Sequence, residues 1–154
     1  MKYAQYYKCA LQVNPSAYSQ YRGKDKMEES EYNTQILNIC KEENIRVVGL
    51  ADHGSVERAE NLRKLLTDNG ILVFPGFEIS TAEKIHIVCL FSPETDANEL
   101  NRILGQLGMP EIKNGTEKSN LSCIDIAKKI AENDGFWYAA HITSDNGILK
   151  LGQL

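Results

Sequence analysis

Several short runs of this sequence are apolar at almost every position, where a half-buried strand would alternate apolar and polar residues. The clearest run is Val47–Ala51, and similar runs lie at 8–13, 71–74, 84–91 and 136–140. Strands that are apolar on both faces need cover on both sides, which is typical of parallel sheets flanked by helices. Helical periodicity fills the segments between them, over 32–43, 56–68, 97–107 and 122–133. The pattern predicts an α/β fold, either a barrel or a doubly wound sheet.

The residues between these segments predict loops, breaks and caps. The polar segment 14–31 is expected to be a loop, and Pro75-Gly76 is expected to interrupt the extended structure. Asn69-Gly70 is expected to end one helix, and Ser122, three residues before Asp125, is expected to cap the start of another.

The composition fits a single domain. The chain has 154 residues, of which 42% are hydrophobic, and this is enough for one packed core. Its net charge is -4 with both signs interspersed, so no basic stripe predicts nucleic-acid binding, although nothing excludes it. No apolar run reaches the roughly 20 residues that span a bilayer, and the N-terminus does not resemble a signal peptide. We therefore expect a cytoplasmic protein with no membrane partner.

The four cysteines, Cys9, Cys40, Cys89 and Cys123, are widely spaced and form no C-x-x-C pair. Two disulfides are one interpretation of such a set. Because each cysteine lies among apolar neighbours, buried free thiols fit the pattern better.

Polar residues interrupt the apolar runs near their ends. Asp52 and His53 follow the run 47–51, Glu78 follows 73–77, and His141 follows 137–140, whereas His86 stands near the start of 85–91. In α/β folds the carboxyl ends of the strands meet at the edge of the sheet where ligands bind. Imidazole nitrogens and carboxylate oxygens are ligands for zinc, manganese and iron, and one carboxylate can bridge two ions. These residues are therefore candidates for a metal cluster that hydrolyses phosphate esters.

Each of these residues also has a purely structural interpretation. A single histidine at a strand end is commonly a hydrogen-bonded structural residue, and Asp52 can cap a helix or form a turn with His53 and Gly54. Glu78 is the hardest to explain in this way, because a carboxylate in an apolar segment needs a partner or a metal. Five tyrosines near the N-terminus can stack on bases or cover apolar surface, and they are Tyr3, Tyr6, Tyr7, Tyr18 and Tyr21.

The candidate ligands lie in four short segments that occur in a recognisable order. The segments are Val48–Ser55 (VGLADHGS), Phe74–Ser80 (FPGFEIS), Ile85–Val88 (IHIV) and Ala139–His141 (AAH). They resemble the metal-binding motifs of the polymerase-and-histidinol-phosphatase (PHP) domain family, with alanine in place of the threonine of its Thr-Asp-His motif. The resemblance covers nearly the whole chain and implies an incomplete or distorted (β/α)7 barrel of PHP type.

The same resemblance implies roles for individual residues. It makes His53, Glu78, His86 and His141 metal ligands, with Glu78 bridging ions and Asp52 orienting His53. The ions would be zinc, manganese or iron, and the substrate a phosphate ester, with a nucleotide or a nucleic-acid end as one form of it. Asp52 and Glu78 are the residues that we expect to support catalysis directly.

Two departures from the family pattern stand out. The family opens with Asp-Leu-His-x-His, but this chain reads Ala-Leu-Gln-Val-Asn over 10–14, so Gln12 and Asn14 replace two histidines. Because an amide offers only a weak, neutral oxygen ligand, we expect fewer than three ions. The chain also stops before the family's final Asp-x-His, which predicts one PHP-like domain over 1–154 that is truncated at its C-terminus.

Two functions follow as alternatives. The first is a metal-dependent phosphoesterase in which water attacks a phosphate ester. The second is a noncatalytic PHP-like module that binds a partner or regulates a larger protein. Family members also occur fused ahead of ATPases, so a downstream ATPase domain is a possible partner, although no Walker A motif is present in this sequence.

Overall fold

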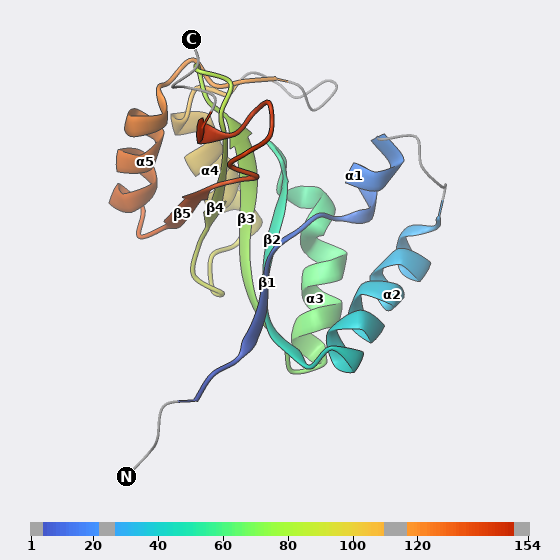
Figure 1. Cartoon of the computed structure of the whole chain (residues 1–154). Coiled ribbons are helices and arrows are strands. Elements are labelled where there is room, and N and C mark those ends of the chain that lie inside the picture. Colours follow the sequence, from blue (N-terminus) through green and yellow to red (C-terminus); the bar gives the residue numbers. More distant parts are fainter. Residues whose placement is uncertain (1–4, 22–26, 110–116, 150–154) are drawn as a thin grey trace.

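The computed structural model describes residues 5–21, 27–109 and 117–149. Within these residues, five strands form one sheet in the order β1-β2-β3-β4-β5, accompanied by five α-helices and one 3-10 turn (Figure 1). The strands are β1 (Lys8–Val13), β2 (Ile45–His53), β3 (Leu72–Ser80), β4 (His86–Leu90) and β5 (Phe136–Ala139). The helices are α1 (Ser16–Tyr21), α2 (Glu29–Glu42), α3 (Glu60–Asp68), α4 (Ala97–Gln106) and α5 (Cys123–Glu132), and the 3-10 turn is η1 (Glu57–Ala59).

The sheet is open and mixed, so the predicted (β/α)7 barrel is wrong. The pairs β1–β2 and β2–β3 are parallel, whereas β3–β4 and β4–β5 are antiparallel. The reversal follows from the short connection between β3 and β4, where Lys84 takes a positive φ of 66° and Thr81 N–H donates to the Ile85 carbonyl. A turn of this length joins antiparallel neighbours, because a parallel pair needs a crossover of a dozen or more residues. Apolar runs alone carry no information on strand direction.

Most predicted elements are present with shifted ends. The expected loop over 14–31 contains α1, and β3 runs through Pro75 and Gly76, where we expected a break. Pro75 is tolerated inside a strand because it gives up only its N–H, while its carbonyl still accepts from Phe91 N–H. The predicted caps are confirmed, since Ser122 accepts from Asp125 N–H at the start of α5.

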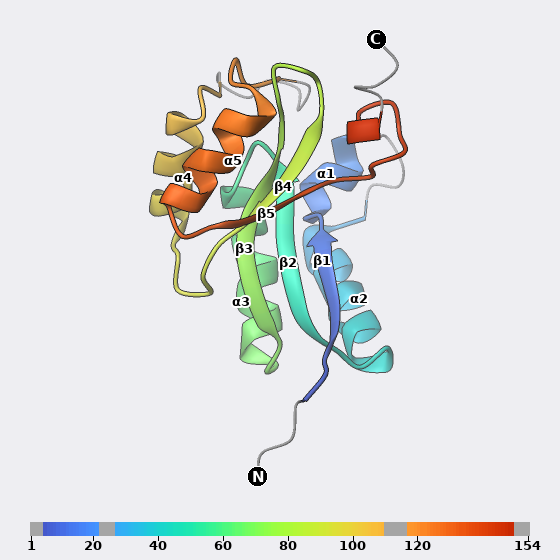
Figure 2. The same cartoon turned by 60° about the vertical axis from the view of Figure 1, so that its left-hand side comes forward.

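Helices α2 to α5 pack against one face of the sheet. Helices α2 and α3 cover β2 and the start of β3, and α4 and α5 cover β3 and β4 (Figure 2). The buried side chains of this layer include Leu50, Leu66, Phe77, Ile103 and Ile130. The opposite face, which we call the inner face, carries a smaller apolar cluster of Ala51, Val88, Leu90 and Ala140.

The inner face is strongly curled. An added Cβ at Gly76 would lie 1.9 Å from the Cys89 carbonyl oxygen, and one at Gly49 would lie 2.5 Å from the Leu11 carbonyl oxygen. These glycines therefore permit a close approach that a larger residue would prevent. The Tyr138 hydroxyl on β5 donates to the Leu11 carbonyl on β1 over 2.9 Å, so the first and last strands of the sheet meet across this face.

All four cysteines are free thiols, as predicted against the disulfide alternative, but the expectation that all of them are buried is wrong. Cys40 and Cys89 are buried, whereas Cys9 is exposed and Cys123 is half-buried. Among the residues that the structure describes, no helix has the length and apolar character needed to cross a membrane.

Candidate metal centre

Glu78 is the centre of a polar cluster on the inner face. It lies on β3, and its side chain is only 1% exposed. Its Oε1 atom lies 2.6 Å from His86 Nδ1 and 3.3 Å from His141 Nε2. Its Oε2 atom lies 3.5 Å from His53 Nε2 and accepts a hydrogen bond of 2.6 Å from Gln12 Nε2. The structure thus brings together the four side chains that the sequence proposed as ligands.

Strand positions explain this convergence. His53 is directly opposite Glu78 in the parallel β2–β3 register, and both residues lie at the carboxyl ends of their strands. His86 begins β4 and pairs with Ser80, next to that end of β3 because β4 runs in the opposite direction. His141 follows β5, the antiparallel neighbour of β4. The antiparallel strands therefore deliver their histidines to the edge at which the parallel strands end.

The electrostatics of the cluster favour an ionised Glu78. Burial alone would raise the pKa of this carboxyl, but contact with His86 and the nearby His53 and His141 lower it below its ordinary value of 4.5. A buried carboxylate among imidazoles is thus the resting state of the site at neutral pH.

Three of these residues fit the requirements for holding a divalent ion. His53, Glu78 and His86 each offer one ligand atom, and these atoms all lie within 4.8 Å of one another. Two imidazole nitrogens and one carboxylate oxygen are a donor set that zinc, manganese and iron accept. The described part of the chain therefore contains a possible three-residue metal site. The metal-ligand roles of the individual residues remain predictions.

His141 lies at the rim of this group. Its side chain is 39% exposed, and its Nδ1 atom lies 2.6 Å from Ser144 Oγ. Its backbone has a positive φ of 26°, a conformation that non-glycine residues seldom adopt outside functional or strained sites. Ser144 N–H also donates to the His141 carbonyl, so Ser144 contacts both the ring and the backbone of His141. No pattern in the sequence pointed to Ser144.

Tyr18 is a second contact that sequence reasoning did not assign to the site. Its ring stacks on His53, with a centroid separation of 4.7 Å and an angle of 6° between the ring planes. The His53 ring also meets the His86 ring edge to face, with a centroid separation of 5.5 Å and an angle of 74° between the ring planes. Tyr18 belongs to the N-terminal tyrosine group, of which Tyr3 and the Tyr21 side chain lie outside the described residues.

Asp52 contacts His53 through the backbone. Its Oδ1 atom accepts from the His53 main-chain N–H over 2.8 Å, and its Oδ2 atom lies 3.2 Å from Arg58 Nε. Burial raises the pKa of Asp52, and the Arg58 guanidinium offsets part of this rise. The residue is 1% exposed, and it follows Val48 and Leu50 on the helix-covered side of β2. Its predicted roles in catalysis and in orienting His53 remain predictions.

The two positions that depart from the family pattern differ from each other. Gln12 reaches the cluster, where its Nε2 atom donates to Glu78 Oε2. Asn14 lies just beyond β1, where its carbonyl accepts from the Tyr32 hydroxyl over 2.9 Å. The Asn14 Oδ1 atom is buried, and it has no hydrogen-bond partner among the residues that the structure describes.

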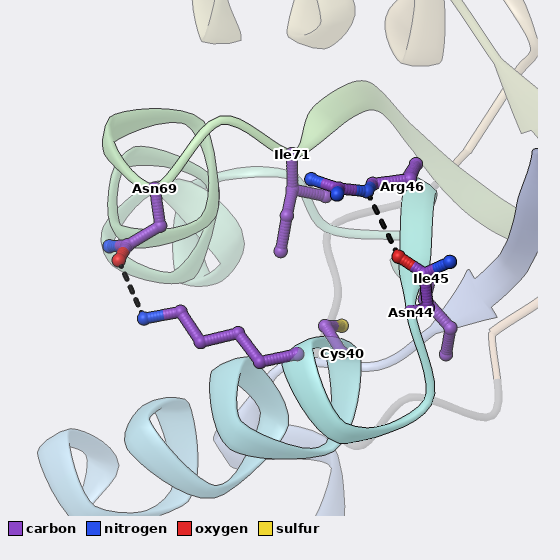
Figure 3. A pocket seen from close by; sticks show the side chains of 7 residues that line it. Cys40, Asn44, Ile45, Arg46, Asn69 and Ile71 are labelled. Atoms are coloured by element: carbon purple, nitrogen blue, oxygen red, sulfur yellow. Dashed lines mark hydrogen bonds between the residues drawn. The ribbon is translucent and has the colours of Figure 1, made fainter.

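A small pocket at the opposite end of the sheet has a different character. It lies where β2 and β3 begin, and Figure 3 shows Arg46 Nε donating to Asn44 Oδ1 along its wall. Lys41 Nζ donates to Asn69 Oδ1 in the same lining. Its lining has no histidine or carboxylate. The Glu78 cluster is therefore the better candidate for chemistry.

Comparisons with known proteins agree with this architecture. No family model matches the sequence, and no curated protein does so. The lesion-specific endonuclease PfuEndoQ from Pyrococcus furiosus is similar in structure, with a TM-score of 0.66 and 16% sequence identity over 94% of this chain. Endonuclease Q in complex with a 27-mer duplex that carries an abasic lesion at the active site gives a TM-score of 0.61 and 16% identity over 90% of this chain.

At this identity the likeness concerns the fold. The chain spans 37% and 35% of the lengths of those two endonuclease chains.

Proposed function

We propose that this chain carries a metal-dependent phosphoesterase site of nuclease type, centred on Glu78. The observation that carries the proposal is the convergence of three imidazoles on one buried carboxylate at the carboxyl edge of the parallel strands. An edge of this kind is the usual binding site of α/β folds. The proposed ligands are His53, Glu78 and His86, with His141 as a further contact.

A divalent ion at this site would polarise a phosphoryl oxygen and activate water for attack on phosphorus. The residues of the chain prepare for this chemistry. Glu78 supplies a negative charge that is already ionised and shielded from solvent. Tyr18 holds the plane of the His53 ring, and Ser144 holds the ring of His141. The exposed rim at His141 leaves one side of the cluster open to a substrate.

A nucleic-acid phosphodiester is the substrate class that we propose. Both structural neighbours are described as endonucleases, and one of them binds duplex DNA with an abasic lesion. The net charge of -4 gives this chain no general attraction for a polyanion. Substrate contacts would therefore depend on the site itself, or on segments of a longer polypeptide. A downstream ATPase domain remains a prediction from the family resemblance alone.

The noncatalytic alternative has one observation in its favour. Gln12 carries a neutral amide at a position where the family pattern has an imidazole, and this amide donates a hydrogen bond to one oxygen of Glu78. A site with this substitution can bind an ion and still lack hydrolytic activity. A chain that binds metal and a partner without cleaving any phosphate ester would support this second function.

Hydrolysis assays test the proposal. Purified protein would be stripped with chelator, reloaded with manganese or zinc, and assayed on bis-p-nitrophenyl phosphate, p-nitrophenyl phosphate and a duplex with an abasic site. We expect metal-dependent cleavage of the diesters that falls more than about 100-fold in Glu78→Gln, since loss of even an outer-shell partner costs about 10- to 100-fold. The matched control is Glu42→Gln, on an exposed residue at the end of α2.

The control should retain wild-type activity. Equal rates for wild type and Glu78→Gln would show that the cleavage comes from a contaminant or from another site. Absence of both metal binding and cleavage in the folded wild-type protein would contradict the proposal as a whole.

A further inference from the structure

Four side chains of the described residues lie close to the Glu78 carboxylate, and Gln12 is the one among them that is not a histidine. It reaches Oε2 from β1, and its hydrogen bond of 2.6 Å is as short as the contact that His86 makes to Oε1. Gln12 is itself exposed, whereas the Glu78 side chain is 1% exposed. Gln12 therefore covers Oε2 from the solvent side, and both oxygens of the carboxylate are in close contact with a neighbour.

The chemistry of an amide differs from that of an imidazole at this position. An imidazole nitrogen can give up its proton and offer a lone pair, so a histidine can exchange its contact with Glu78 for a contact with a cation. The amide nitrogen of Gln12 is a permanent donor with no lone pair to offer. If the amide turned over, its oxygen would face the carboxylate oxygen of Glu78, and a neutral amide oxygen is a weak ligand for zinc-like ions.

The two carboxylate oxygens of Glu78 therefore offer a cation unequal binding positions. An ion held by His53, Glu78 and His86 has three ligand atoms within 4.8 Å of one another, and Gln12 is not one of these ligands. A second ion bridged by Glu78 requires a carboxylate oxygen of its own. At Oε2 it would meet the N–H group of Gln12, and at Oε1 the only further imidazole contact is His141, at 3.3 Å.

We infer that Gln12 restricts this centre to a single divalent ion by holding Oε2 of Glu78 in a hydrogen bond. The inference rests on the proposed function, because it presupposes that the cluster binds a divalent cation. It assigns to Gln12 a positioning role that sets the number of ions. A one-ion site would have no second cation to stabilise the leaving oxygen of a phosphodiester.

The test is a count of bound ions that does not depend on activity. Chelator-treated protein would be dialysed to equilibrium against manganese, and bound metal per chain would be measured by elemental analysis. Electron paramagnetic resonance of the manganese would then distinguish isolated ions from exchange-coupled pairs. We expect about one ion per chain in the wild type, with the spectrum of an isolated ion.

Two variants should change the count. Gln12→His supplies an imidazole lone pair and frees Oε2, and Gln12→Glu supplies a carboxylate that needs a cation beside Glu78. We expect each variant to bind about two ions per chain, with a spin-coupled spectrum, because two-metal sites place their ions about 3.5–4 Å apart. The control Gln35→His adds a histidine at an exposed position of α2 and should leave the count at one.

The outcomes separate the two proposals. Two ions in the wild type, or a single ion in each Gln12 variant that folds, would overturn the role of Gln12 and leave the metal centre standing. No bound ion in the wild type would overturn the metal centre itself, and the inference with it. Circular dichroism of each variant shows whether it is folded, and either folded variant suffices for the count.

Discussion

Replacing Glu78 by glutamine tests whether the cluster stabilises the protein before any ion is bound. The substitution keeps the shape of the side chain and removes its charge. Two contacts at 2.6 Å, from His86 and Gln12, change from charge-assisted to neutral. A hydrogen bond to a charged group contributes about 1.5–3 kcal/mol and a neutral one about 1 kcal/mol, so the Gln12 hydrogen bond loses about 1 kcal/mol. The His86 Nδ1 atom is close to Oε1 without hydrogen-bond geometry, and it loses its attraction to the charge.

The substitution also removes the cost of burying a charge, and this gain opposes the loss. Burial is the largest single influence on the pKa of Glu78, yet the contacts outweigh it, because the pKa is lowered overall. We therefore expect a net loss of about 1 kcal/mol at pH 7 in the metal-free protein. For a chain of this size that corresponds to a fall in Tm of about 2–4 °C.

The assay is urea unfolding followed by circular dichroism, with chelator present, for wild type, Glu78→Gln and the exposed control Glu42→Gln. The folded pKa of Glu78 is lowered, so its contribution is present above the ordinary value of 4.5 and is lost as the pH falls through the folded pKa. The difference between wild type and Glu78→Gln should shrink over that acidic range. A Glu78→Gln variant as stable as wild type at pH 7 would refute the reasoning, because it would mean that the contacts do not outweigh the burial of the charge.

Four further substitutions test the sheet, one helix and the second buried carboxylate. Asp52→Asn should raise the free energy of unfolding at pH 7, because burial raises the pKa of Asp52 and makes its ionised form costly. This gain in stability should vanish as the pH falls below 3.8, where Asp52 is protonated in both the folded and the unfolded state. A gain that persists below that pH would contradict the prediction. Tyr138→Phe removes the hydroxyl that joins β5 to β1 and should cost about 1 kcal/mol in urea unfolding. Gly76→Ala places a Cβ 1.9 Å from the Cys89 carbonyl and should cost about 3 kcal/mol or prevent folding, whereas Gly105→Ala in α4 meets nothing within 4 Å and should gain up to about 1 kcal/mol.

The candidate ligands could be found from the sequence because they interrupt apolar runs. A carboxylate in a segment as apolar as 73–79 has few structural explanations, so Glu78 was identifiable without coordinates. His53 and His141 were identifiable for a related reason, since each follows a run of strand-forming residues. His86 precedes its strand, and the antiparallel direction of β4 explains why it still reaches the same edge.

The architecture was less accessible. Periodicity identifies a strand by its burial, but strand direction depends on the length and conformation of the connection. The turn with Lys84 at positive φ decides that β4 reverses, and no apolar pattern encodes this. The curl of the sheet depends on Gly49 and Gly76, whose significance appears only when the distance to the neighbouring strand is known.

The contacts around the ligands were the least predictable part of the site. Tyr18 lies in a polar stretch that was predicted to be a loop, and its stacking on His53 depends on α1 folding back over the end of β2. Ser144 comes three residues after His141, and its contact with that ring depends on a tight turn. Both positions are set by the path of the backbone, which sequence periodicity does not describe.

The cluster draws on every strand of the described sheet, and this links its chemistry to the integrity of the fold. Gln12 comes from β1, His53 from β2, Glu78 from β3 and His86 from β4, and His141 follows β5. A change in the register or curl of any strand would therefore move one partner of Glu78. Removing the bridge between β1 and β5 in Tyr138→Phe should thus weaken metal binding as well as stability, although Tyr138 is not among the proposed ligands. A variant that lost stability and kept its full metal affinity would show that the ligand group is held locally, by the register of β2, β3 and β4 alone.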